Sequence, residues 1–178
     1  MKISRFFKQF YVKSLSKAKY IEYLRKLGVR IGKGCDIDKT ANFGSEPWLI
    51  KLGDNVRITR GVQFITHDGA LWTLRKMGLI DGQSVKYGPI KIGDNCNISW
   101  NSIILPNITI GKNSIVAAGA VVTHNVPEGS IVGGVPARVI ESVDEYYEKI
   151  KNDCVPAFSM SNAQKREYLE KIKPEWFE

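Results

Sequence analysis

Two histidines, His67 and His124, are the only imidazole groups in this chain of 178 residues. Histidine is the side chain best suited to accept a proton near neutral pH, so each is a candidate general base. His67 follows the run Phe64-Ile65-Thr66 and precedes an irregular stretch, 68–89, which would place its imidazole at the rim of a groove. Taken alone, His67 could equally cap the end of a strand. His124 comes just after Val122-Thr123, where a solvated corner position is the simpler interpretation.

A histidine base needs a partner that fixes its tautomer, and the candidates are Asp68, Glu46 and Asp36. Adjacent side chains on a strand face opposite ways, so Asp68 is better placed to contact an acceptor than to hold His67. Glu46 stands in the segment Ser45-Glu46-Pro47-Trp48, from which it could pair with the histidine or solvate a bulge. We rank Asp68 above Glu46 as a site residue.

An aliphatic or aromatic residue recurs every six positions through most of the chain. From residue 92 the series is Ile92, Ile98, Ile104, Ile110, Val116 and Val122, and mostly small residues follow four positions after each: Cys96, Ser102, Ile108, Ser114, Ala120 and Val126. Upstream the period gives Ile31, Ile37 and Phe43, then, after three added residues at 46–48, Leu52, Ile58 and Phe64. A six-residue period fits neither an amphipathic helix nor hairpins. It predicts very short strands joined by tight corners, with three hexads per coil and stacked coils forming a parallel β-helix.

Three regions follow from this pattern. Residues 1–30 are predicted to be a basic helical segment with Gly28 as its stop, and residues 31–140 are the repeat domain with the inserted loop 68–89. Residues 141–178 form a tail with helices over 142–153 and 161–173, the second opened by a Ser161-x-x-Gln164 capping box. A loop of this size in a regular solenoid is usually functional, and its Trp72 and Arg75 are candidate acceptor contacts.

Residues 92–140 resemble the C-terminal half of the hexapeptide-repeat acyltransferases, in particular the galactoside and maltose O-acetyltransferases. Residues 44–69 resemble the acyltransferases of capsule and surface-polysaccharide pathways, so the resemblance covers about 110 residues, 31–140. It implies an all-β core that is a left-handed parallel β-helix with flanking N- and C-terminal α-helices. It also implies acetyl-CoA as the co-substrate and a homotrimer with active sites between subunits.

The resemblance also implies roles for single residues. The family's catalytic histidine occupies the place of His67, in a Thr-His pair just before the loop. The family's contacts with coenzyme A correspond to Ala118, Thr123 and Arg138, and relatives often carry a lysine near the coenzyme's phosphates where this chain has His124.

Two positions depart from the family's pattern. Trp100 replaces a small residue that would face the thioester, so it could flank the pantetheine arm, close the acceptor pocket or pack against a neighbouring subunit. Glu141 stands where relatives can carry a second arginine, which implies a weaker or rearranged phosphate site.

Composition excludes several classes of protein. No apolar run approaches the roughly 20 residues of a membrane-spanning helix, and three widely spaced cysteines without a CxxC pair indicate neither a disulfide framework nor a zinc ribbon. Two histidines cannot supply the three-histidine metal site of a γ-class carbonic anhydrase, so no metal is expected. The net charge of +8 is concentrated in residues 1–30 rather than spread with aromatics over the repeats, which argues against a nucleic-acid reader. Residues 1–19 could instead make a peripheral membrane contact at the inner face, or pack their aromatics on the end of the solenoid.

The sequence therefore predicts a cytoplasmic, acetyl-CoA-dependent O-acetyltransferase that acts on a sugar or glycan hydroxyl by direct transfer, with His67 as general base. The alternatives are N-acetylation of an amino sugar and, outside enzymes, a β-helix scaffold. A covalent acyl-cysteine route is disfavoured, since Cys35 and Cys96 fall at inward or corner positions and Cys154 lies outside the repeats. The identity of the acceptor and the hydroxyl that reacts are not encoded in these patterns.

Overall fold

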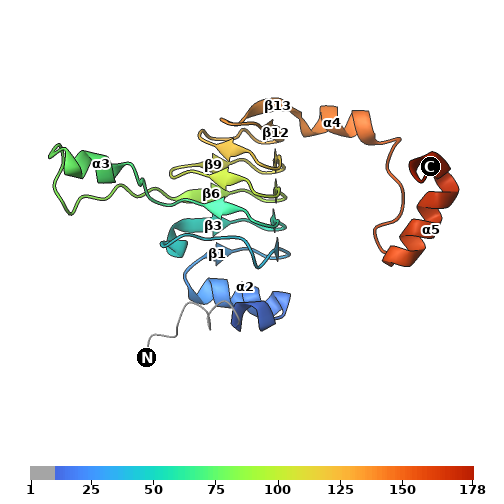
Figure 1. Ribbon diagram of the computed structural model, residues 1–178, viewed down its shortest axis with the longest axis horizontal. Helices are drawn as coiled ribbons and strands as arrows, with labels where there is room; N and C mark the ends of the chain where they lie inside the picture. Colours follow the sequence, from blue (N-terminus) through green and yellow to red (C-terminus); the bar gives the residue numbers. More distant parts are fainter. Residues whose placement is uncertain (1–10) are drawn as a thin grey trace. The chain divides into compact units, whose positions relative to one another are not determined.

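The computed structural model describes residues 11–178, which divide into two compact units, the first ending at Tyr146 and the second beginning at Tyr147. The larger unit is a stack of short strands in which the chain returns to the same three sheets again and again (Figure 1). Sheet A contains β1 (Arg30–Ile31), β3 (Ile50–Leu52), β6 (Ile90–Ile92) and β9 (Thr109–Ile110). Sheet B contains β2 (Asp36–Ile37), β4 (Arg57–Ile58), β7 (Asn97–Ile98), β10 (Ile115–Val116), β12 (Ser130–Gly133) and β13 (Arg138–Ser142). Sheet C contains β5 (Gln63–Phe64), β8 (Ile103–Ile104) and β11 (Val121–Val122).

Strand pairing confirms three hexads per coil. Each strand pairs in parallel with a strand one coil later, and the paired residues Lys91↔Thr109, Asn97↔Ile115 and Ile103↔Val121 are all 18 positions apart. Across the inserted loop the separation becomes 40, as in Lys51↔Lys91, without any change of register. Among the strand pairs of residues 11–178, β12 with β13 is the only antiparallel one.

The predicted inward positions form the core. The aliphatic series from Ile92 to Val122 is at most 3% exposed, and the residues four positions later, from Cys96 to Val126, are at most 5% exposed. Between strands, five asparagines (Asn55, Asn95, Asn101, Asn107 and Asn113) adopt positive φ values at the corners. Asparagine tolerates this left-handed backbone better than most residues, which explains why the hexads turn so tightly.

The segments outside the repeats differ in part from expectation. The predicted single helix over 1–30 is interrupted, because residues 11–14 are helical and α2 (Lys17–Lys26) starts anew at an N-cap, Ser16. Residues 1–10 lie outside the described part of the chain. Gly28 follows α2 with a φ of +100°, as expected of a helix stop. The inserted loop contains a short helix that was not predicted, α3 (Leu71–Lys76), which projects away from the stack (Figure 1).

The C-terminal helices are confirmed as α4 (Val143–Ile150) and α5 (Asn162–Ile172). Ser161 and Gln164 form the predicted capping box. The short 3-10 helices η1 (Pro47–Leu49) and η2 (Pro174–Trp176) complete the elements. Within residues 11–178, no helix has the length and apolar character needed to cross a membrane.

Candidate active site

His67 lies where sheet C ends and the inserted loop begins, and its Nδ1 is 3.0 Å from Oε2 of Glu46. A carboxylate can only accept, so the proton between them belongs to Nδ1 and Nε2 carries the free lone pair. Glu46 is 13% exposed and His67 41%, so the acid is shielded while the imidazole reaches the surface. This tautomer is the one that a general base requires.

Glu46 is held by a second bond. The buried hydroxyl of Thr66 donates to the same Oε2 at 2.6 Å. Burial would raise the pKa of Glu46, but the hydrogen bonds from Thr66 and then His67 outweigh it and leave that pKa below its ordinary value of 4.5. The carboxylate therefore stays ionised beside the imidazole.

A tight turn brings Glu46 to this position. Gly44 has a φ of +66°, and a Cβ on it would lie 3.0 Å from the carbonyl oxygen of Phe64. The interruption at 46–48 continues into η1, whose N-cap is Glu46. The residues that break the hexad period are thus the ones that deliver the acid to His67.

Asp68 points to the loop rather than to the base. Its Oδ1 accepts from the backbone N–H of Ala70, and its Oδ2 is 3.8 Å from Nζ of Lys86. The stem of the loop closes in the same place, because His67 pairs antiparallel with Tyr87. Asp36, the third candidate acid, lies on sheet B, where Nζ of Lys17 is 2.6 Å from its Oδ1. Of the three acids, only Glu46 contacts His67.

A depression of about 390 Å³ opens beside the base. Its lining includes His67, Asp68, Lys86 and Thr123. The space is large enough for a polar acceptor and places a cation and a hydroxyl near the imidazole.

A second depression, of about 340 Å³, is lined by His124 and Arg138. Thr123 connects the two, since its Oγ1 is 2.8 Å from Nδ1 of His124. The predicted phosphate contacts therefore share one depression, next to the one that holds the predicted base.

Trp100 and Ala118 lie at a different corner. The N–H of Gly119 donates to the carbonyl of Trp100, so the two corner segments stack between sheets B and C. By the register of sheet C, Trp100 is level with Arg60, at the corner before β5, whereas His67 follows the other end of β5. Both side chains are exposed, and a Cβ on Gly119 would meet no atom within 4 Å. One protomer therefore does not bring this open corner to His67.

The two acceptor candidates in the loop are also separate from the base. Trp72 and Arg75 lie on α3, where Trp72 is 65% exposed and Nε of Arg75 donates to the carbonyl of Leu71. Sequence reasoning named Thr66 only as part of the Thr-His pair, without a role of its own, and did not single out Lys86 or Tyr87. Thr66 could have been found, because it is a polar residue two positions after the inward Phe64 and so faces the same side of the strand. Lys86 and Tyr87 had no sequence feature that marked them.

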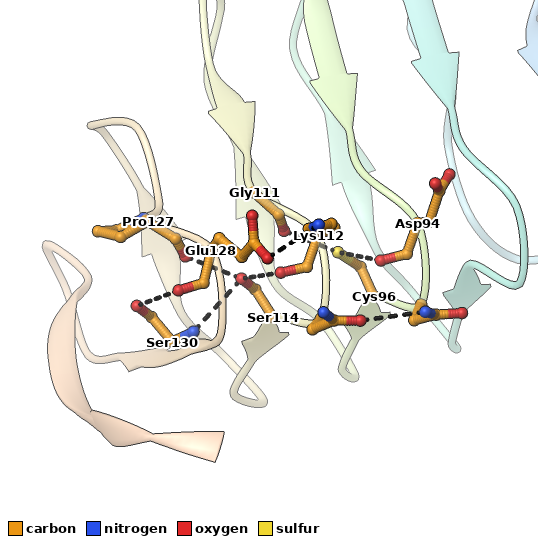
Figure 2. A network of polar contacts seen from close by, with 10 residues as sticks. Asp94, Cys96, Gly111, Lys112, Ser114, Pro127, Glu128 and Ser130 are labelled. Carbon is orange, nitrogen blue, oxygen red and sulfur yellow. Dashed lines mark hydrogen bonds and ion pairs between the residues drawn. The ribbon is translucent and has the colours of Figure 1, made fainter. Parts of the chain in front are cut away.

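The two cysteines of the repeats, Cys96 and Cys35, occupy structural positions in which their thiols bond backbone carbonyls. Sγ of Cys96 donates to the carbonyl of Gly111 at 3.0 Å, and one coil later Oγ of Ser114 donates to the carbonyl of Pro127 at 2.9 Å (Figure 2). Burial raises the pKa of the Cys96 thiol, and burial likewise raises the pKa of Cys35. Neither is a poised nucleophile. Across residues 11–178, no group of three or more His, Cys, Asp or Glu side chains is arranged to hold a metal ion.

Comparison with known proteins gives matches along most of the chain. A family model described as the hexapeptide repeat of succinyl-transferase matches residues 89–124. The chain is 42% identical over 166 residues to protein CapG of Staphylococcus aureus, covering 91% of this chain and 94% of CapG. It is 35% identical over 117 residues to the galactoside O-acetyltransferase of Escherichia coli K12, covering 61% of this chain and 55% of that enzyme. Among solved structures, the hexapeptide-repeat-containing acetyltransferase VCA0836 of Vibrio cholerae, complexed with acetyl coenzyme A, is 28% identical with a TM-score of 0.57 and covers 75% of this chain and 82% of that one.

Proposed function

This chain belongs to the hexapeptide-repeat acyltransferases, and from that premise we propose that it transfers an acetyl group from acetyl-CoA to a hydroxyl of a sugar or glycan. The observation that carries the proposal is the bond between Nδ1 of His67 and the carboxylate of Glu46 at the edge of an open depression. The likeness of residues 44–69 to surface-polysaccharide acyltransferases favours a glycan of that kind as acceptor.

In this proposal His67 is the general base, which its hydrogen bond to the carboxylate of Glu46 supports. Its Nε2 takes the proton of the acceptor hydroxyl as the hydroxyl oxygen attacks the thioester carbonyl. The carbon–sulfur bond then breaks, and the imidazolium returns the proton to the departing thiolate. The carboxylate of Glu46 stabilises the imidazolium between these two proton transfers, and Thr66 keeps the carboxylate in place.

The residues predicted for the donor suit its chemistry. His124 and Arg138 provide polar and cationic groups for phosphates in one depression, and Thr123 leads from there to the base. Arg138 is exposed and has no ion-pair partner within residues 11–178. Trp100 and Ala118 would flank the pantetheine arm, where the open space at Gly119 gives room for it.

Because one protomer separates Trp100 and Ala118 from His67, we propose that the site is shared between copies in a homotrimer of left-handed β-helices. The outward residues of sheet C are Gln63, Ile103 and Val121, which carry no charge and suit burial in an interface. The corner of His67 lies at one edge of this sheet and the corner of Trp100 at the other. If sheet C faces a threefold axis, the first corner of each copy adjoins the second corner of the next.

The test combines two inactive variants. We expect His67→Ala to lose at least about a hundredfold in kcat, because the acceptor hydroxyl then attacks the thioester without a base to take its proton. Ala118→Trp should also inactivate the enzyme by filling the donor's space. Mixing and reassembling the two proteins should restore activity, since some sites then combine an intact His67 with an intact Ala118.

Near-native turnover by His67→Ala would overturn the catalytic assignment. If mixed assemblies recovered no activity although sedimentation showed trimers, the shared site would be overturned.

A peripheral membrane contact through residues 1–19 also remains part of the proposal. The described portion of this segment contributes Lys13, Lys17 and Lys19, which are all exposed.

A further inference from the structure

The outer face of sheet A carries a row of like charges. Arg30, Lys51 and Lys91 are paired in direct register on β1, β3 and β6, and all three are exposed. At the usual spacing of about 4.8 Å between strands, the row is about 10 Å long and one side chain wide. None of the three has an ion-pair partner within residues 11–178. We call these residues the cationic row.

The other two sheets arrange charge differently. On sheet B, the same register sets Asp36 opposite Arg57, which is an attractive pair, and sheet C has uncharged residues outside. Like charges directly opposite each other destabilise a sheet. Asp54 and Asp94, the acids that follow strands β3 and β6, each accept a backbone N–H from the neighbouring coil, and within residues 11–178 neither forms an ion pair with the row. The cationic row is therefore not explained by the stability of the fold.

Two exposed aromatic residues lie, along the chain, between the residues of the base and those of the cationic row. Trp48, 57% exposed, is two residues from Glu46 and three from Lys51. Tyr87, 52% exposed, is paired with His67 and its ring meets the imidazole edge-on at a centroid distance of 6.3 Å. Lys91 is four residues from Tyr87, a span of at most about 13 Å. Base, aromatic rings and cations thus follow one another along the edge and face of sheet A.

We propose that the cationic row and Trp48 bind the part of the acceptor that lies beyond the reacting hydroxyl, and that this part is an acidic glycan. The inference rests on the proposed glycan acceptor. Sugar rings present apolar faces that aromatic side chains can cover, and carboxylate or phosphate groups at intervals along the glycan would pair with Arg30, Lys51 and Lys91. A row one side chain wide suits a linear polymer better than a membrane plane. Sheet A is also free in the proposed trimer, in which sheet C faces the axis.

The experiment measures binding rather than turnover. The full chain is titrated with hexagalacturonate, with neutral maltohexaose, with UDP-N-acetylglucosamine, and with vesicles of phosphatidylglycerol and phosphatidylcholine. The variant is Lys51→Gln/Lys91→Gln, and the matched control is Arg57→Gln, which removes a charge from sheet B in the same coil as Lys51. Hexagalacturonate and UDP-N-acetylglucosamine distinguish carboxylates from phosphates as the source of the negative charge.

We expect the double variant to bind hexagalacturonate about tenfold more weakly, with a smaller dependence on salt, while Arg57→Gln stays within about twofold of wild type. The double variant should lose the same factor in a His67→Ala background, so a failure of the catalytic assignment would leave this result unchanged. Stronger loss with UDP-N-acetylglucosamine would support the row and assign its partner as phosphate. Equal weakening by the variant and the control, no binding of either anionic probe, or row-dependent binding of vesicles alone would overturn the proposal.

Discussion

Replacing Glu46 by Gln tests how the active site works, because it keeps the shape of the side chain and removes its charge. In the proposed mechanism His67 becomes an imidazolium, with Nδ1 3.0 Å from Oε2 of Glu46. At that distance, an effective dielectric constant of about 20 gives an attraction of about 5 kcal/mol, which is an upper limit since His67 is 41% exposed. Charge-assisted hydrogen bonds contribute about 1.5–3 kcal/mol. A loss of about 2–3 kcal/mol corresponds to a fall in kcat of about 30- to 150-fold.

The assay follows acetylated product by mass spectrometry, because the exposed Cys154 would react with thiol reagents used to detect free coenzyme A. KM for the acceptor should change little, since Glu46 contacts His67 and Thr66 rather than the open depression. Asp68→Asn is the matched control, as it neutralises the other acid beside His67.

Two outcomes would refute this reasoning. A fall in kcat of less than about threefold in Glu46→Gln would mean that the carboxylate does not support proton transfer. An effect of Asp68→Asn on kcat as large as that of Glu46→Gln would mean that the nearby negative charge, rather than the bond to Nδ1, is what matters.

Two further predictions concern stability. Because the pKa of Glu46 is lowered, its carboxylate stabilises the fold above about pH 4.5 and loses that contribution as the pH falls through the lowered folded-state value. Urea unfolding near pH 7 and near pH 4 should therefore show a smaller acid-induced loss of stability in Glu46→Gln than in wild type. Equal losses would contradict this prediction. Cys96→Ser should keep its bond to the carbonyl of Gly111, just as Ser114 bonds the carbonyl of Pro127 one coil later. It should retain turnover and change the unfolding free energy by less than about 1 kcal/mol, whereas Cys96→Val should lower that free energy by about 1–3 kcal/mol. Inactivity of a folded Cys96→Ser would favour the acyl-cysteine route.

The repeat architecture could be predicted from the sequence because each hexad repeats the same local choice. An inward aliphatic residue, a mostly small residue and an asparagine or glycine corner agree at most turns, so the 18-residue pairing of Lys91 with Thr109 follows from counting. The elements outside the repeats were harder to predict from the sequence. Helix α3 buries no residue, so no apolar period marks it, and the break between residue 14 and α2 depends on a single N-cap serine, Ser16.

The sequence narrowed the candidates for the acid that holds His67 to three residues but did not identify Glu46 among them. Strand alternation correctly argued that Asp68 faces away from the base. The contact with Glu46 depends on the turn at Gly44 and on the direction that η1 takes, which are set by steric contact with Phe64 and Thr66 in another coil. Such contacts between positions 20 residues apart are not expressed in local residue preferences.

A three-sided coil gives a sequence separate control over each face. Strands of two or three residues expose a single outward side chain each, and residues six apart in the chain belong to different sheets. Lys51, Arg57 and Gln63 are successive outward positions of one coil, yet they lie on a face of like charges, a face of paired charges and an uncharged face. Charge can therefore accumulate on the face beside the base without disturbing the face proposed to join the subunits. The resulting destabilisation is confined to repulsion between like charges on neighbouring strands of sheet A. Lys51→Gln/Lys91→Gln should therefore leave the protein at least as stable as wild type while weakening its binding of an acidic glycan.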